Sequence, residues 1–254
     1  MKLSIVIPAH NEEGSIEETI STLYAKLKEN RIDHEIVVVN DHSRDTTEAI
    51  LARMSTEMDT LVYYNNDGPG GFGNAIRYGL ARFSGDCVAI MMADLSDSPD
   101  DLLKFYHKLM EGYDCVFGTR WSNGGKVVDY PFVKKIINRM ANAIVKYTFA
   151  LKYNDCTNAF KIYRKETIQG LQPLLSHHFN LTLELPLKAI VRGYSYAIVP
   201  NSWHNRKHGE SKLKIKEMGS RYFFILMYCL IEKFFSRGDY KKADAKKVTM
   251  AKRA

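Results

Sequence analysis

The chain lacks the features that mark a secreted, disulfide-bonded or membrane-spanning protein. Its 254 residues include four cysteines, which form no Cys-x-x-Cys pair and are expected to be small core residues in a reducing compartment. No run reaches the roughly 18 apolar residues that a spanning helix needs. The first apolar run is also too short for a signal peptide, so we expect a cytoplasmic protein. No Pro- or Gly-rich linker divides the body.

Charge is unevenly distributed along the chain. The 36 basic and 29 acidic residues give a formal net charge of +7, and residues 237–254 hold seven Lys or Arg against two Asp, which is +5 of the total. The nearly balanced body argues against a nucleic-acid groove. A basic tail after an apolar segment favours an anionic membrane surface. A solvated tail without a partner is the alternative.

Short apolar runs alternate with segments of helical period over the first 120 residues. Unbroken apolar runs are typical of strands that are buried on both faces. The repeated strand–helix–strand pattern predicts an α/β fold with a doubly wound, mostly parallel sheet. The expected strands are Leu3–Ile7, Glu35–Val39, Leu61–Tyr64, Cys87–Met91 and Asp114–Phe117, with two further pieces at Ala159–Tyr163 and Tyr194–Val199.

Helix starts are indicated by capping residues. Ser15 with Glu18 reads as a capping box before a helix whose apolar face repeats every three or four residues. Asp45 with Glu48 indicates the next helix. Ser98 followed by Pro99 indicates another, because proline suits the first helical position. Helical spacing returns between residues 136 and 147.

Residues 222–231 form the longest apolar run and are followed by Glu232 and Lys233. Such a helix is too short to cross a bilayer, so we expect it to lie in the membrane interface or against a membrane-protein partner. A core helix packed on the domain is the alternative.

Polar clusters follow four of the expected strands, at residues 8–12, 40–45, 93–97 and 118–120. Ligands of doubly wound sheets bind beyond the carboxyl ends of the strands, so these clusters are expected to share one crevice. Asp41 there can accept hydrogen bonds from the imino edge of uracil or guanine, or can cap its turn. The glycine-rich segment 68–74 precedes a helix and can bring backbone N–H groups to a diphosphate, or can be an ordinary turn.

The segment 93–97 is the best metal candidate. Asp94, with Ser96 and Asp97, can hold Mg²⁺ or Mn²⁺ against a departing diphosphate, although the acids can also be a helix-start cluster. Residues 204–212 combine arginine, lysine, serine and exposed N–H groups, which makes a phosphate clamp.

Together these segments resemble the family-two inverting glycosyltransferases, and within them the dolichyl-phosphate mannose synthase-like, polyprenyl-phosphate branch. The resemblance covers roughly residues 3–215. It rests on six motifs in order, at residues 6–12 (Val-Ile-Pro-Ala-His-Asn-Glu), 38–47, 71–75 (Gly-Phe-Gly-Asn-Ala), 114–120, 155–161 and 206–213, the last ending in Gly-Glu-Ser-Lys-Leu.

The resemblance implies a nucleotide-sugar-binding domain of GT-A type at residues 1–215. The apolar run and the basic segment after it predict a short membrane- or partner-associated helix at 216–236 and a basic flexible tail at 237–254. The resemblance also implies transfer of a hexosyl group from a GDP- or UDP-linked sugar to a polyprenyl or dolichyl phosphate with inversion, on the cytoplasmic face of a membrane. A lipid phosphate is already ionised, so the site needs positioning and charge relief and no general base.

Site residues are carried over motif by motif. The resemblance implies that the donor is bound by Pro8, Ala9, Asn11, Glu12, Asp41, Gly71, Gly73 and Asp94. It assigns catalytic roles to Asp94, Arg120, Arg206 and Lys212, the metal to Asp94, Ser96 and Asp97, and the acceptor phosphate to Lys134, Arg206, Ser211 and Lys212.

The sequence departs from the family pattern at the metal motif. Met92 stands where the first acid of Asp-x-Asp is usual, and Ser96 stands at the glutamine position. We therefore expect a metal site that is weaker, shifted towards Asp97 or dispensable. Gly70 replaces a common cation before the glycine turn, and Lys134 replaces a common arginine.

Two other functions remain open at this stage. The same fold can transfer sugar to a saccharide or protein hydroxyl, which requires a carboxylate base. The chain can also be a nucleotide-sugar-binding relative that lost catalysis when Met92 replaced an acid. The sugar and the nucleotide cannot be read from these residues.

Overall fold

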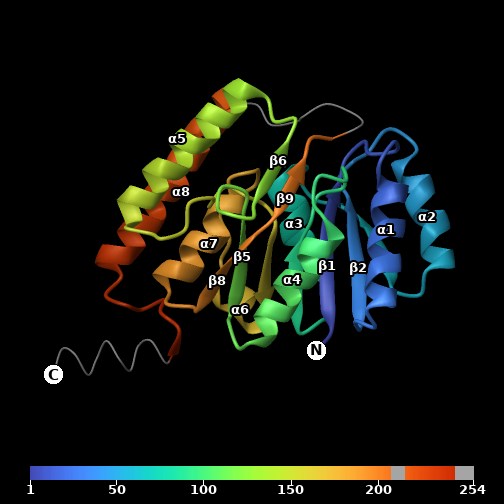
Figure 1. Cartoon of the computed structure of the whole chain (residues 1–254), viewed down its shortest axis with the longest axis horizontal. Coiled ribbons are helices and arrows are strands. Elements are labelled where there is room, and N and C mark those ends of the chain that lie inside the picture. Colours follow the sequence, from blue (N-terminus) through green and yellow to red (C-terminus); the bar gives the residue numbers. More distant parts are fainter. Residues whose placement is uncertain (207–214, 244–254) are drawn as a thin grey trace.

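The computed structural model describes residues 1–206 and 215–243 and confirms a mixed α/β fold with a mostly parallel sheet (Figure 1). Seven strands lie in the order β3-β2-β1-β4-β7-β5-β8, and only β7 runs antiparallel to its neighbours. The strands of this sheet are β1 (Leu3–Ala9), β2 (His34–Asn40), β3 (Leu61–Asn65), β4 (Cys87–Ile90), β5 (Cys115–Thr119), β7 (Lys161–Arg164) and β8 (Tyr196–Pro200). Two short strands, β6 (Lys126–Val128) and β9 (Ser202–His204), pair in parallel beside it.

The sheet is buried on both faces, which explains its unbroken apolar strands. In β1, for example, Ile5 and Ile7 pack into one core and Val6 into the other. One face is covered by α1 (Ile16–Glu29), α2 (Thr47–Glu57) and α4 (Pro99–Met110). The opposite core contains residues of α3 (Phe72–Leu80), α5 (Phe132–Phe149), α6 (Lys165–Gly170), α7 (Leu181–Val191) and α8 (Ile215–Phe235). All four cysteines are buried thiols.

The predicted helix starts lie where the sequence placed them, but the capping interaction predicted for one of them is wrong. Pro99 occupies the first turn of α4 after Ser98, as predicted. Ser15 precedes α1, but it makes no side-chain cap, so the predicted capping box is wrong. The Ser15 hydroxyl instead donates to Glu12 Oε2 at 3.1 Å, because the loop after β1 turns back on the helix start.

The α8 helix is packed on the body through one face. Ile225 and Cys229 are fully buried against the core that contains α7. Glu232, the acid that follows the apolar run, is buried and accepts two hydrogen bonds from Arg192, at 2.8 and 2.9 Å. No helix within residues 1–206 and 215–243 is long and apolar enough to cross a membrane.

Candidate active site

A cleft of about 630 Å³ opens beyond the carboxyl ends of the parallel strands. It brings together most of the residues singled out in the sequence, which come from all four polar clusters. Its lining includes Pro8, Ala9, Glu12, Asp41, Gly71, Asp94, Ser96, Asp97, Arg120, Lys134 and Arg206. Ser211 and Lys212 lie outside the described residues, as does the tail beyond residue 243.

Asp41 fixes the glycine-rich turn at one end of the cleft. It is buried, and its carboxylate accepts a hydrogen bond from the Gly71 N–H at 2.8 Å and another from the Asn66 side chain at 2.8 Å. These bonds hold the glycine-rich turn, whereas the sequence alternative was that Asp41 caps its own turn. Asp41 also borders the cleft, where a nucleotide base can reach its remaining lone pairs.

The glycines of this turn are required by a neighbouring backbone. Gly71 has a φ of 134°, which is strained for any other residue. A Cβ on Gly73 would lie 2.6 Å from the carbonyl carbon of His177, and the Asn74 N–H donates to the His177 carbonyl at 3.2 Å. Gly73 is thus packed against the segment that precedes α7 and is not part of the cleft lining.

Asn11, which was predicted to bind the donor, connects two loops and is also not part of the cleft lining. Its N–H donates to Ser43 Oγ at 3.0 Å, and its Oδ1 accepts from the Arg44 N–H at 2.7 Å. These bonds hold the segments after β1 and β2 together. Asn11 therefore fixes the relative position of these two segments, which border the cleft.

Asp94 and Asp97 lie in the loop after β4, and both are buried. The Met92 N–H donates to Asp97 Oδ2 at 3.0 Å, and the Ser96 N–H donates to Asp94 Oδ1 at 3.2 Å. Burial raises the pKa of Asp97 to about 7, against the opposing effect of the Met92 hydrogen bond, and the nearby charge of Asp94 raises it further. The loop thus presents two buried carboxyl groups to the cleft.

The donor set of this loop fits a divalent ion of the magnesium type. The described residues contain no group of three or more His, Cys, Asp or Glu, but such ions commonly use one or two carboxylates and complete their shell with waters and substrate phosphates. Ser96 Oγ is buried and has no hydrogen-bond partner among the described residues. An unpaired buried hydroxyl beside two carboxylates is consistent with an additional hard ligand at this position.

Arg206 points at this acidic loop. Its Nη2 lies 2.7 Å from Asp94 Oδ2, and its Nη1 lies 3.8 Å from Glu12 Oε1. Asp94, which was predicted to bind the metal, and Arg206, which was predicted to bind the acceptor phosphate, therefore form an ion pair. The guanidinium occupies the position where a cation would meet the carboxylate of Asp94.

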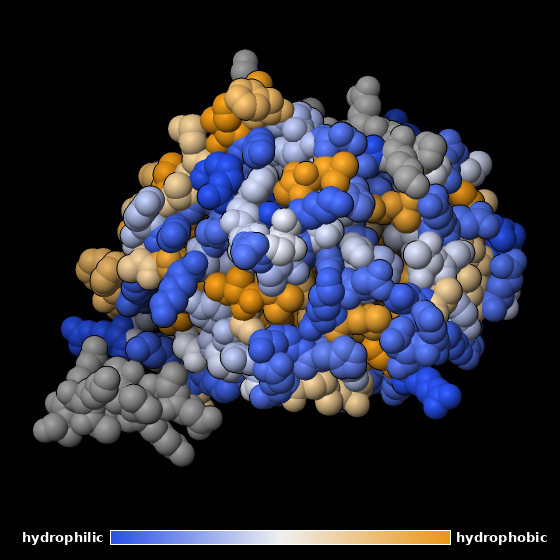
Figure 2. All heavy atoms as spheres, in the orientation of Figure 1, coloured by the Kyte–Doolittle hydropathy of each residue, from blue (hydrophilic) through white to orange (hydrophobic). Residues whose placement is uncertain are grey.

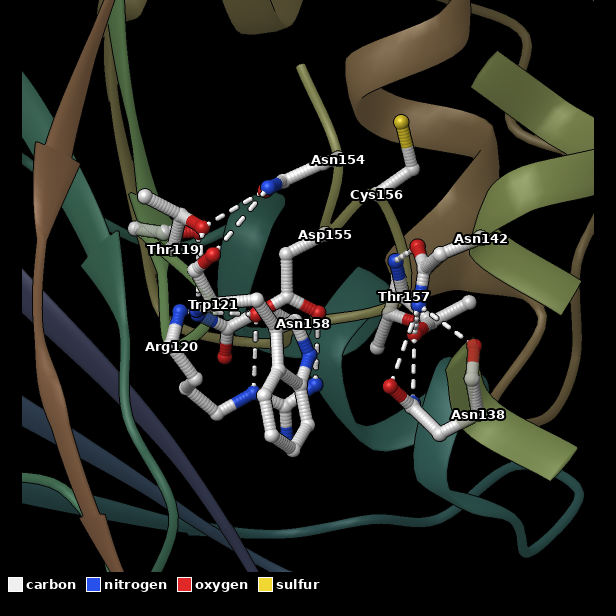
Figure 3. A network of polar contacts seen from close by, with 12 residues as sticks. Thr119, Arg120, Trp121, Asn138, Asn142, Asn154, Asp155, Cys156, Thr157 and Asn158 are labelled. Carbon is white, nitrogen blue, oxygen red and sulfur yellow. Dashed lines mark hydrogen bonds and ion pairs between the residues drawn. The ribbon is translucent and has the colours of Figure 1, made fainter. Parts of the chain in front are cut away.

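Arg120 is held by a buried carboxylate, as Figure 3 shows. Its Nε and Nη2 donate to the two oxygens of Asp155, at 2.8 and 2.7 Å, and its backbone N–H also donates to Asp155 at 3.0 Å. Both residues are almost fully buried. Arg120 thus reaches the cleft as half of a fixed ion pair, and not as a mobile cation.

The turn that carries Asp155 is tied to α5. Thr157 Oγ1 accepts hydrogen bonds from the side chains of Asn138 and Asn142 at 2.9 and 2.8 Å (Figure 3). This network couples the orientation of α5 to the floor of the cleft.

Sequence reasoning missed the part of the cleft wall that comes from α7, α8 and the β6–β9 region. These residues are Tyr130, His178, Phe179, Thr182, Trp203, Arg221 and Tyr222. Phe179 stacks on Phe72 with ring centroids 4.2 Å apart, and its carbonyl accepts from Tyr222 Oη at 3.1 Å. Gly73 was the one sequence signal for this wall. A glycine in the first turn of a helix indicates that another backbone approaches closely, but it does not identify that segment.

A second, apolar groove of about 360 Å³ lies between α5 and α8. Its walls include Ile137, Ile144, Val145, Leu183 and Leu226. It shares Tyr130, Lys134, Asn138, Thr157 and Tyr222 with the polar cleft, so the two spaces adjoin.

Comparison with known proteins agrees with this geometry. The sequence profile of the family described as "Glycosyl transferase family 2" matches residues 4–171. Over 221 residues the chain is 33% identical to dolichol-phosphate mannosyltransferase of Pyrococcus furiosus, covering 85% of this chain and 60% of that protein. Over 216 residues it is 28% identical to undecaprenyl-phosphate 4-deoxy-4-formamido-L-arabinose transferase of Shewanella sediminis, covering 83% and 61%. The chain therefore spans about three fifths of the length of these two relatives.

Solved structures share the fold. Glucosyl-3-phosphoglycerate synthase of Mycobacterium tuberculosis, crystallised with Mn²⁺, UDP and phosphoglyceric acid, superposes with a TM-score of 0.68 at 20% identity, covering 90% of this chain and 78% of that one. Another crystal of the same enzyme contains Mg²⁺ and UDP, with a TM-score of 0.66 at 20% identity, covering 91% of this chain and 79% of that one. The likeness confirms the GT-A type of architecture.

Proposed function

The chain belongs to glycosyl transferase family 2, and on this premise we propose that it transfers a hexosyl group from a nucleoside-diphosphate sugar to a polyprenyl phosphate with inversion. Two relatives that support the proposal are named for dolichol phosphate and undecaprenyl phosphate. Their names differ in the sugar, so the sugar transferred here is a question for experiment.

The observation that carries the proposal is the junction of the polar cleft with the apolar groove. The cleft offers carboxylates, hydrogen-bond donors and cations, which suit a nucleotide sugar and a phosphate. The groove between α5 and α8 offers almost only apolar walls, which suit a hydrocarbon chain. A polyprenyl phosphate has a phosphate end that suits the cleft and a hydrocarbon chain that suits the groove, whereas a free sugar has no apolar part to fill the groove.

In the proposed reaction a phosphate oxygen of the lipid attacks the anomeric carbon. The bond from that carbon to the donor diphosphate breaks, and the nucleoside diphosphate leaves from the opposite face. No proton has to be removed from the acceptor, so no general base is required. A divalent ion, when bound by Asp94 with Ser96 and Asp97, would neutralise charge on the leaving diphosphate.

The chain's own residues position the two substrates. Asp41 and Gly71 form the donor end of the cleft, and Pro8, Ala9 and Glu12 form its base. Lys134 lies on the rim shared by cleft and groove, where a lipid phosphate would sit at the end of its chain. Arg120, fixed by Asp155, lines the same cleft and offers it a hydrogen-bond donor in a set orientation. Ser211 and Lys212, beyond the described residues, remain proposed phosphate ligands.

Transfer of label from a nucleotide sugar tests the proposal. A thermal-shift screen of GDP- and UDP-sugars selects the donor, and the labelled donor is then incubated with polyprenyl phosphate or with soluble saccharides. We expect label in the organic-solvent extract only when polyprenyl phosphate is present. Label in a saccharide would favour the hydroxyl-acceptor function, and donor binding without turnover on any acceptor would favour a binding protein.

We further propose that α5 and α8 rest on an anionic bilayer, which would be the cytoplasmic leaflet. Their outward residues are exposed and apolar, and Figure 2 shows apolar side chains gathered along the edge that α5 forms. They are Phe132, Val133, Ile136, Met140, Ile144 and Tyr147 on α5 and Phe223, Phe224, Ile231, Phe234 and Phe235 on α8. The α5 sequence also has four Lys or Arg and no acid. An exposed apolar face of this size with basic residues suits a membrane surface, and the groove would then open towards the lipid. A membrane-protein partner is the other occupant to test.

A further inference from the structure

The Asp94 carboxylate has a protein partner on each of its two oxygens. Oδ1 accepts the Ser96 N–H at 3.2 Å and Oδ2 contacts Arg206 Nη2 at 2.7 Å, and the residue is 4% exposed. A divalent ion of this class binds carboxylate oxygen at roughly 2.0–2.1 Å and carries two positive charges. Two positive charges that contact the same carboxylate repel each other, so the guanidinium of Arg206 opposes binding of such an ion at Asp94.

Arg206 is placed to serve as an internal cation. It follows β9, and its side chain is only 17% exposed between Asp94 from the β4 end and Glu12 from the β1 end. Met92 contributes no acid here, and the one guanidinium contacts two carboxylates, those of Asp94 and Glu12. This corner of the cleft thus lacks the acid that is usual at position 92 and has the positive charge of Arg206 beside Asp94.

The guanidinium leaves one demand of the loop unmet. Ser96 Oγ stays buried without a hydrogen-bond partner among the described residues while Arg206 occupies Asp94. A hard cation would supply the partner that this hydroxyl lacks among the described residues.

Resting on the proposed function, we propose that Arg206 and the divalent ion are alternative occupants of Asp94. Binding of metal with the donor displaces Arg206 from the carboxylate and turns its guanidinium towards the phosphates in the cleft. Arg206 thereby meets the acceptor phosphate only after the donor end is filled, which orders the two substrates. Thermodynamic linkage requires the converse, namely that Arg206 weakens metal binding.

Binding of Mn²⁺ alone, followed by electron paramagnetic resonance without donor or acceptor, tests this inference. Arg206→Gln should tighten Mn²⁺ binding about tenfold, within the range usual for coupled sites. Arg221→Gln is the matched control, because it removes one positive charge from the same cleft lining. Asp94→Asn in the Arg206→Gln background should abolish the gain. Circular dichroism confirms that each variant is folded, and Arg206→Met, which is also neutral, replaces Arg206→Gln if it is not.

Equal tightening in both arginine variants would show a general field effect and overturn the inference. Unchanged or weaker Mn²⁺ binding in Arg206→Gln, or no binding in either protein, would overturn it as well. Because this measurement involves no sugar transfer, failure of the proposed reaction would appear separately, in the labelled-donor assay.

Discussion

At the residue scale, Asp41 combines a structural bond with a predicted recognition role. Its carboxylate holds the Gly71 N–H, and Asn66 supports it from the other side. Loss of the Asp41 charge should therefore affect nucleotide binding, whereas loss of Asn66 should affect mainly the turn.

We predict that Asp41→Asn loses most of the stabilisation given by the nucleoside diphosphate. That stabilisation should be about 2.7 kcal/mol for the wild type at a ligand concentration of a hundred times Kd. Asn66→Ala, the control, should unfold at a lower temperature and keep its ligand-induced shift. Equal ligand-induced shifts in Asp41→Asn and the wild type would show that Asp41 only holds the turn.

Arg120 and Asp155 should behave as one structural unit. Removing one member of a buried ion pair leaves an uncompensated charge, which usually costs about 3–5 kcal/mol. We expect Arg120→Gln and Asp155→Asn each to lower the free energy of unfolding by about that amount in urea titrations. The double variant should lose less than the sum of the two. If Arg120→Gln is as stable as the wild type, the pair is not structural, and the proposed hydrogen-bond donation by Arg120 in the cleft is its remaining role.

Glu35 gives a pH-dependent prediction far from the cleft. Burial alone would raise its pKa, but hydrogen bonds from Ser4 and Ser84 and the nearby Lys2 outweigh burial and lower the pKa from 4.5 to about 2. A lowered pKa in the folded state stabilises the protein above pH 4.5, and this stability is lost as the pH falls from 4.5 to 2.

Glu35→Gln should lower the free energy of unfolding by about 2 kcal/mol at pH 7, after allowance for solvent screening. The variant should also lose less stability than the wild type as the pH falls from 4.5 to 2. Urea unfolding at several pH values between 2 and 7 measures both effects. If the variant loses as much stability at low pH as the wild type, other carboxylates cause the acid destabilisation.

At the scale of elements, the two faces of α8 call for different experiments. Deletion of residues 217–254 would remove Ile225, Cys229 and Glu232, which are buried against the body. Truncation would therefore expose core and confuse unfolding with loss of membrane binding. Substitutions on the outer face avoid this problem.

We predict that Ile136→Ser with Met140→Ser on α5, or Phe224→Ser with Phe235→Ser on α8, weakens binding to anionic vesicles about tenfold to a hundredfold. Each buried apolar side chain contributes roughly 1.5–3 kcal/mol, part of which is lost in each substitution. Stability should change by less than about 0.5 kcal/mol, because these residues are exposed. Vesicle co-sedimentation measures the binding.

Met110→Ser on α4 is the control, since Met110 is exposed and apolar on a helix of the opposite layer. Equal loss of vesicle binding in this control, or none in the α5 and α8 variants, would assign the apolar face to a protein partner.

Elements with strong contrast between their faces were predictable from the sequence, and those without it were not. The helix at residues 136–147 was found from its period, yet the period did not reveal that Ile136 and Met140 face outwards. The α7 helix was missed because it is buried on nearly all sides and contains Pro186, which argues against a helix. Its buried ion pair of Glu184 and Lys188, 2.6 Å apart, became visible only in three dimensions.

At the scale of the whole molecule, the parallel topology explains why the site was largely predictable. The carboxyl ends of β1, β2, β4 and β5 lie at one edge, so the residues that follow them meet in one cleft. The contact of Arg206 with Asp94 was not predictable, because it joins two motifs about 110 positions apart whose roles had been assigned separately. The apolar groove was hidden for the same reason, since α5 and α8 are distant in sequence.

The arrangement of cleft, groove and outward apolar face points to one central claim, that the acceptor is a lipid phosphate. Polyprenyl phosphate and the matching polyprenol test it most directly, presented in identical anionic vesicles with the donor selected by the thermal-shift screen. Mass spectrometry of the extracted lipid should show a mass increase of one hexosyl unit on the polyprenyl phosphate and none on the polyprenol, because only the phosphate is ionised without a base. Equal transfer to polyprenol, or transfer to neither lipid alongside transfer to a soluble saccharide, would contradict the account.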